Sequence, residues 1–130
     1  MRFFVYGTLK PGHERFPVVE PFVTRVERAH TPGHLFDLGP YPAAQFDSQA
    51  SDMISGYLIW TVDEDHVLRS LDVIEGHPHL FVRKTIVVNV DGRTSPAYGY
   101  EFVHAAHLSD ATRISEWHPE RDAIPMEDEA

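Results

Sequence analysis

The chain contains no cysteine in its 130 residues. This absence excludes a disulfide-stabilised scaffold, a zinc site with thiolate ligands and a cysteine nucleophile. The sequence also has no run of about 20 apolar residues, which a membrane-spanning helix requires. Its N-terminus lacks a basic region followed by the roughly 7–15 apolar residues of a secretory signal peptide. These absences predict a cytoplasmic protein with no membrane partner.

Basic residues are scarce as well. The chain has 11 Lys and Arg against 20 Asp and Glu, a formal net charge of −9. A chain this acidic is not expected to bind nucleic acid or an anionic membrane, because both repel negative charge. Part of the excess lies in residues 123–130, which we expect to form an acidic C-terminal tail without a fold of its own. An acidic surface usually confers solubility; attraction of a cationic substrate is the alternative.

Several common catalytic motifs are missing. There is no Gly-x-Gly-x-x-Gly and no P-loop, so no nucleotide cofactor is expected, and no Gly-x-Ser-x-Gly supports a serine hydrolase. The nine histidines raise a metal hypothesis, and the closest pairs are His77 with His79 and His104 with His107. Neither pair has the helical spacing of His-Glu-x-x-His, and both fall in predicted loops. We interpret them as surface histidines and expect no metal and no other cofactor.

The composition that is present is that of an ordinary globular domain. Apolar residues make up 42% and charged residues 24% of the chain. At this length we expect one domain with a single core, spanning residues 1–122, and we find no repeat and no low-complexity linker.

The pattern of apolar residues predicts more strands than helices. Strands are expected over residues 3–6, 22–26, 33–38, 54–62, 81–90 and 95–103. Helix is expected from the residue after a possible N-cap at Asp63 to Glu75, and again from 109 to about 117, while residues 13–21 are irregular or briefly helical and 41–52 form a loop. The Asp91–Gly92 dipeptide predicts a hairpin turn between the last two strands, which pairs them antiparallel. The chain is therefore predicted to be an α+β barrel.

The helix before Gly76 carries the first candidate functional residue. Its apolar stripe consists of Val67, Leu68, Leu71 and Ile74, after Asp63 as a possible N-cap. Glu75 follows Leu71 by four residues, which extends the stripe toward the interior. The carboxyl end of the helix and nearby Asp72 both oppose a negative charge there, so three effects are expected to raise the pKa of Glu75. Glu75 is a candidate general base; the alternative is a frayed last turn that leaves it in water.

The first dozen residues carry the second candidate. Residues 3–6 are an apolar, aromatic run typical of a buried strand, and residues 7–12 end it abruptly. A strand that stops at Gly7 and Thr8 exposes consecutive backbone N–H groups, and such a nest can hold a carboxylate. A tight turn without a ligand is the alternative.

Together these segments resemble one family. Residues 6–12, 39–43, 71–76, 82–88 and 97–100 match, in order and spacing, the motifs of the γ-glutamylcyclotransferase-like proteins of the γ-glutamylamine cyclotransferase or AIG2-like branch. The resemblance extends from about Arg2 to Phe102. It implies a small, mixed β-barrel flanked by helices, and release of a γ-glutamyl group as 5-oxoproline with Glu75 as proton acceptor. One position departs from the family: Phe81 stands where the family usually has Tyr.

These observations lead to a functional hypothesis. A γ-glutamyl(amine) cyclotransferase would use Glu75 as its base and acid, with the amides of Gly7, Thr8 and Leu9 holding the α-carboxylate or the developing oxyanion. Tyr6 and Tyr98 are expected to line the pocket, with buried barrel aromatics as the alternative. A non-catalytic domain that binds a small carboxylate is the competing hypothesis, and the Phe81 departure favours it. The sequence does not identify the leaving amine.

Overall fold

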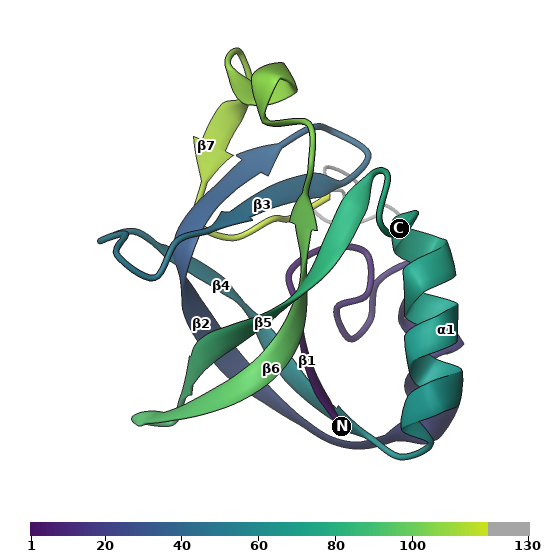
Figure 1. Ribbon diagram of the computed structural model, residues 1–130. Helices are drawn as coiled ribbons and strands as arrows, with labels where there is room; N and C mark the ends of the chain where they lie inside the picture. Colours follow the sequence, from purple (N-terminus) through teal and green to yellow (C-terminus); the bar gives the residue numbers. More distant parts are fainter. Residues whose placement is uncertain (120–130) are drawn as a thin grey trace, which may run out of the picture.

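Seven strands, one α-helix and three 3₁₀ helices form residues 1–119, the part of the chain that the computed structural model describes (Figure 1). The strands are β1 (Arg2–Val5), β2 (Val23–Asp37), β3 (Pro42–Phe46), β4 (Met53–Thr61), β5 (Phe81–Val90), β6 (Arg93–Phe102) and β7 (Thr112–Ile114). The helices are η1 (Phe16–Val18), η2 (Glu20–Phe22), α1 (Glu64–Glu75) and η3 (Ala105–Leu108). The predicted domain boundary at residue 122 and the acidic tail, residues 123–130, lie outside the described residues.

The strands form a mixed barrel. Their order is β3-β2-β4-β1-β6-β5, and pairing of His30 in β2 with Asn89 in β5, the last strand, closes the barrel. β1 and β6 are parallel, with Phe3 opposite Tyr98, and the other strand pairs are antiparallel. The predicted α+β class and mixed, mainly antiparallel barrel are confirmed.

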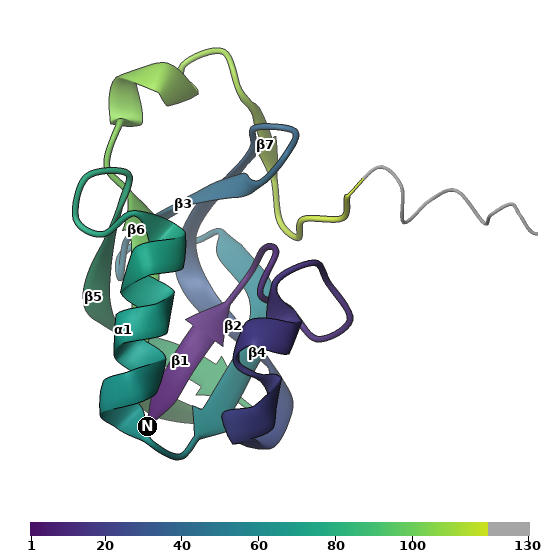
Figure 2. The same cartoon turned by 90° about the vertical axis from the view of Figure 1, so that its right-hand side faces the viewer.

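β1 is buried on both faces, which explains its unbroken apolar sequence. Phe3 and Val5 belong to a core cluster that includes Val67 of α1 and Val19, between η1 and η2. Figure 2 shows β1 between α1 and this η1–η2 segment. Phe4 belongs instead to a second cluster, formed largely with residues of β2, β4 and β5. Alternation of side chains along the strand thus lets β1 connect the helix layer to the rest of the barrel.

Helix α1 has the predicted bounds. Gly76 adopts a left-handed conformation with φ +63°, and its N–H donates to the carbonyls of Asp72 and Val73. This is the glycine termination expected at a helix end. Asp63 occupies the N-cap position, but its side chain makes no capping hydrogen bond to the described residues. None of the described helices has the length and apolar content needed to cross a membrane.

Two of the sequence predictions for the first half of the chain were wrong. The strands expected at 22–26 and 33–38 are one strand, β2, and the loop expected at 41–52 contains β3. Pro32 is accommodated within β2 opposite Met53. Gly33 gives β3 room to approach, since a Cβ there would lie 2.5 Å from the Gln45 carbonyl oxygen.

The C-terminal helix prediction was also wrong, whereas the hairpin was correct. Residues 112–114 form β7, which pairs with the second half of β2 through Leu35 and Ile114. Pairing with the edge of β2 outweighed a weak local helix preference. At the predicted turn, Asp91 and Gly92 both have positive φ, +51° and +77°, as a two-residue hairpin requires.

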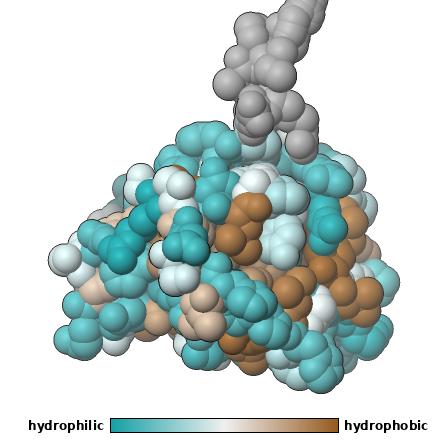
Figure 3. All heavy atoms as spheres, turned by 90° about the horizontal axis from the view of Figure 1, so that it is seen from above, coloured by the Kyte–Doolittle hydropathy of each residue, from teal (hydrophilic) through white to brown (hydrophobic). Residues whose placement is uncertain are grey.

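Seen from above, hydrophilic residues cover most of the surface, and hydrophobic residues gather in smaller groups between them (Figure 3). This mixture is normal for a solvent-exposed face.

Candidate active site

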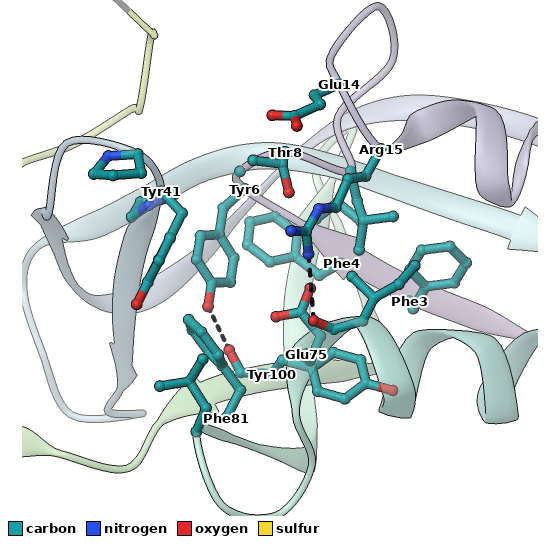
Figure 4. A pocket seen from close by; sticks show the side chains of 17 residues that line it. Phe3, Phe4, Tyr6, Thr8, Glu14, Arg15, Tyr41, Glu75, Phe81 and Tyr100 are labelled. Carbon is teal, nitrogen blue, oxygen red and sulfur yellow. Dashed lines mark hydrogen bonds between the residues drawn. The ribbon is translucent and has the colours of Figure 1, made fainter.

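A cavity of about 360 Å³ lies where β1 ends (Figure 4). Three segments supply most of its wall: β1 with the loop that follows it, the loop that leads into β3, and the last turn of α1. The lining residues are Phe3, Phe4, Val5, Tyr6, Gly7, Thr8, Leu9, Glu14, Arg15, Pro40, Tyr41, Pro42, Ile74, Glu75, Leu80, Phe81 and Tyr100. Its size lies within the range of about 300–1,000 Å³ typical of small-molecule sites.

The structure brings together most of the residues selected from the sequence. Glu75 lines the cavity with Tyr6, Gly7, Thr8 and Leu9. These residues come from segments almost 70 positions apart in the sequence, roughly the span that separates Tyr6 from Glu75.

Tyr98 does not line this cavity, which corrects the sequence prediction. It faces a separate, more open hollow beside Trp60 and Arg2. The reason is register: Tyr98 lies opposite Phe3, well before the end of β1. Tyr100, on the same face of β6 and two residues further along, reaches the cavity instead.

The Glu75 carboxylate points into the cavity, as Figure 4 shows. Burial raises the pKa of Glu75 from its ordinary value of 4.5 to about 7, and the nearby Arg15 guanidinium partly opposes this rise. A carboxyl group with this pKa exchanges protons readily near neutral pH.

Asp72 does not act as the repulsive neighbour that the sequence predicted. Its Oδ1 accepts a hydrogen bond from the Tyr100 hydroxyl at 2.6 Å, and its Oδ2 accepts one from Arg83. The negative charge of Asp72 is therefore compensated within this network. Arg83 thereby connects β5 to the last turn of α1.

Tyr6 and Tyr100 connect the network to the cavity. The Tyr6 hydroxyl donates to the Tyr100 carbonyl oxygen at 2.5 Å. Burial, then the nearby Glu75 charge, holds the pKa of Tyr6 well above its usual value. Burial, followed by the Asp72 hydrogen bond, raises the pKa of Tyr100 as well. Both hydroxyls therefore stay protonated at neutral pH and act as hydrogen-bond donors.

The loop after β1 presents free amides. The Gly7 and Thr8 carbonyls accept hydrogen bonds from the N–H groups of Lys10 and Arg15, at 3.0 and 2.8 Å. Within residues 1–119, the N–H groups of Gly7, Thr8 and Leu9 donate to no protein acceptor. Consecutive backbone N–H groups without an acceptor in the protein can bind an anion.

Arg15, Tyr41 and Tyr100 are among the cavity residues that the sequence did not predict. Tyr41 belongs to a motif that was noted, yet its place in the wall depends on β3, which was predicted as loop. Its ring packs edge-on against Phe81, with ring centroids 5.9 Å apart. Phe81, the position that departs from the family pattern, is only 5% exposed and lines the cavity.

Among residues 1–119, no group of three or more His, Asp or Glu side chains is arranged to hold a metal ion. His77 is engaged elsewhere, since its Nδ1 accepts a hydrogen bond from the Arg83 backbone N–H at 3.0 Å.

Comparison with known protein families shows to which family this chain belongs. The sequence profile of the gamma-glutamyl cyclotransferase, AIG2-like family matches residues 3–119. The chain belongs to this family. No curated protein matches the chain.

Solved structures share the fold of this γ-glutamyl cyclotransferase family member. A crystal structure of an AIG2-like protein from mouse superposes with a TM-score of 0.77 at 20% identity, covering 90% of this chain and 87% of that one. YkqA from Bacillus subtilis gives 0.70 at 23% identity, covering 89% of this chain but only 39% of the longer protein. A solution structure from Arabidopsis thaliana gives 0.64 at 26% identity, covering 95% and 72%.

The effect of Arg15 on Glu75 can be measured in this family member. Because the Arg15 cation lowers the pKa of Glu75, Arg15→Gln should raise that pKa further. Carboxyl ¹³C NMR titration of the two proteins measures the change. Arg93→Gln, at an exposed arginine in the β5–β6 hairpin, serves as the control and should leave the pKa unchanged. A Glu75 pKa that falls or stays constant in Arg15→Gln would contradict the assignment.

The raised pKa of Glu75 also predicts a pH dependence of stability. Protonated Glu75 favours the folded state, so its contribution is full below pH 4.5 and is lost as pH rises through about 7. The loss amounts to at most about 3 kcal/mol, at 1.36 kcal/mol for each pH unit between the two values. Urea unfolding of the wild type and Glu75→Gln across this interval measures it. The wild type should lose stability relative to the variant, and a constant difference would show that Glu75 is not buried.

Proposed function

We propose that this protein is a γ-glutamyl(amine) cyclotransferase that releases 5-oxoproline and a free amine from a γ-glutamyl compound. One observation carries the proposal: a carboxyl group of raised pKa, Glu75, shares a cavity with the free amides of Gly7, Thr8 and Leu9. A proton acceptor and an anion site in one cavity suit a substrate that carries an ammonium and a carboxylate on the same carbon.

The substrate lies with its α-carboxylate on the loop amides, because consecutive N–H groups bind carboxylates without a metal. Its α-ammonium then faces Glu75. The protonated hydroxyl of Tyr100 holds Asp72, and with it the last turn of α1, which keeps Glu75 directed into the cavity.

Ring closure takes two protons from the α-nitrogen. Glu75 removes the first from the α-ammonium, and the neutral amine attacks the γ-carbonyl carbon. The bond from that carbon to the leaving nitrogen then breaks as Glu75 gives this proton to the leaving nitrogen. The ring nitrogen loses its second proton, which the released amine takes up to become an ammonium ion. The products are 5-oxoproline and the free amine, and no metal or organic cofactor takes part.

The enzyme mainly has to fold the substrate and manage protons. Nucleophile and electrophile belong to one molecule, and well-oriented intramolecular reactions reach effective molarities of about 10⁵–10⁸ M. A Glu75 pKa of about 7 suits a group that must accept and donate a proton near neutral pH.

A non-catalytic carboxylate-binding domain is the second candidate. Phe81 favours it, because this apolar ring lines the cavity at the position where the family pattern noted in the sequence usually has Tyr. Against it stands Glu75, since a binding domain has no need to keep a carboxyl group that burial destabilises when charged.

Incubation with a panel of γ-glutamyl amines tests the proposal. The panel should include a γ-glutamyl amino acid, a γ-glutamyl polyamine and a γ-glutamyl isopeptide of lysine, with 5-oxoproline detected by mass spectrometry and Glu75→Gln as control. We expect 5-oxoproline from at least one substrate with the wild type only. Calorimetric binding of 5-oxoproline without release from any substrate would favour the non-catalytic domain.

A further inference from the structure

Lys10 is a buried charge that the proposed reaction does not use. It follows the Gly7–Leu9 amides directly in sequence, yet its side chain turns away from solvent and is only 2% exposed. Its Nζ donates to the Trp117 carbonyl oxygen at 2.6 Å and lies 4.0 Å from a Glu116 carboxylate oxygen. A buried ammonium is costly unless it is hydrogen-bonded and paired, so this contact between distant segments is a specific one.

The segment that Lys10 contacts, residues 115–118, is firmly attached to the barrel; we call it the strap. The Ser115 carbonyl accepts a hydrogen bond from the Ser55 N–H in β4 at 2.9 Å. Glu116 accepts two hydrogen bonds from Arg28 in β2, at 2.7 and 3.1 Å. Trp117 is 2% exposed and packs in the core cluster that contains Phe4 and Tyr6.

A second contact joins the loop to the strap, since the His13 ring lies 6.2 Å from the Trp117 ring between centroids. The internal hydrogen bonds of the loop join Lys10 to Gly7 and His13 to Lys10, which shape the turn but do not fix it to the barrel. Leu9 packs in the first core cluster, and Gly7 lies against Pro42. Lys10 supplies a buried hydrogen bond between the loop and the strap.

We propose that Lys10 is a positioning residue, which fastens the Gly7–Leu9 loop to the strap and thereby sets the affinity of the loop amides for the substrate α-carboxylate. This rests on the proposed function, because it needs the amides to be the carboxylate site. The carboxylate is present in both the bound substrate and the transition state. Loss of the carboxylate site therefore weakens binding of the substrate and of the transition state equally, which raises KM and leaves kcat nearly unchanged.

Lys10→Met tests the proposal, with Lys84→Met as the matched control. Lys84 is half-exposed and pairs with Glu101, away from the cavity. A displacement of the amides of about 1 Å can cost on the order of 10²-fold, so we expect Lys10→Met to raise KM, and to weaken calorimetric binding of 5-oxoproline, by roughly 10- to 100-fold. Lys84→Met should keep both. An unchanged KM, or a fall in kcat with constant KM, overturns the proposal.

A second measurement applies if Lys10→Met does not fold or if the wild type shows no turnover. If Lys10 fastens the loop to the strap, the two open together in the wild type. The amides of Lys10 and His13 in the loop should then exchange hydrogen with the same opening equilibrium constant as the amide of Ser55, which bonds the strap. Loop amides that open more readily than Ser55 overturn the coupling, whatever the protein catalyses.

Discussion

Glu75→Gln should abolish most of the turnover while substrate binding persists. The amide keeps the shape of the side chain but cannot accept the ammonium proton, so ring closure slows. General acid–base catalysis contributes about 10²–10⁴-fold, and we expect a loss of kcat at least in that range. Release of 5-oxoproline from the best substrate of the panel measures it, and calorimetry measures the binding that should remain.

The stability of the same variant separates catalysis from structure. At neutral pH the substitution removes a partly buried carboxyl group whose charged form burial disfavours, so the free energy of unfolding should stay constant or increase. A variant that is less stable than the wild type, yet turns over normally per folded molecule, would make Glu75 a structural residue. The catalytic assignment would then be withdrawn.

Gly7→Val should cause the second-largest loss of activity among the predicted substitutions. A Cβ at Gly7 would lie 2.9 Å from both Cγ and Cδ of Pro42, which is too close for the loop to keep its position. The loop amides would move, and a shift of about 1 Å can cost on the order of 10²-fold in kcat/KM. The damage comes from this contact and not from backbone strain, since Gly7 is not among the glycines with positive φ.

The Pro42 contact provides the control for this substitution. Pro42→Ala removes Cγ and Cδ, so the pair Gly7→Ala with Pro42→Ala should recover activity that Gly7→Ala alone loses. Thermal unfolding shows whether each variant folds. A Gly7→Val protein that binds and turns over substrate like the wild type would make the loop an ordinary turn and refute the anion site.

The sequence correctly predicted the helix and the hairpin, whose formation depends on residues close together in the chain. Helix α1 has the predicted bounds because a stripe ending at Ile74 and a glycine at 76 specify them. The β5–β6 hairpin follows from the Asp91–Gly92 turn. β3 and β7 were missed because their short segments become strands only by pairing with β2, an interaction of residues distant in sequence that no local pattern records.

The residues of the candidate site also divide into those predictable from short sequence patterns and those that depend on contacts between distant segments. Glu75 and the loop at Gly7 were identified from helix periodicity and an abrupt strand end, and the family motifs connected them. Tyr98 was predicted to line the pocket, but Tyr100 does, and only the parallel register of β6 with β1 decides which of the two reaches the cavity. The partners of Asp72 were likewise invisible, since they lie on β5 and β6.

Titration of the Glu75 carboxyl group tests most directly whether Glu75 is the base of a γ-glutamyl cyclotransferase. The Glu75 carboxyl pKa should be measured by ¹³C NMR beside the pH profile of kcat/KM for 5-oxoproline release. We predict a carboxyl pKa near 7 and a fall in kcat/KM as pH drops through the same value, because only the carboxylate accepts the ammonium proton. A Glu75 pKa at or below its ordinary value of 4.5, or a kcat/KM that does not change as pH passes through the Glu75 pKa, would contradict the role of Glu75 as the base.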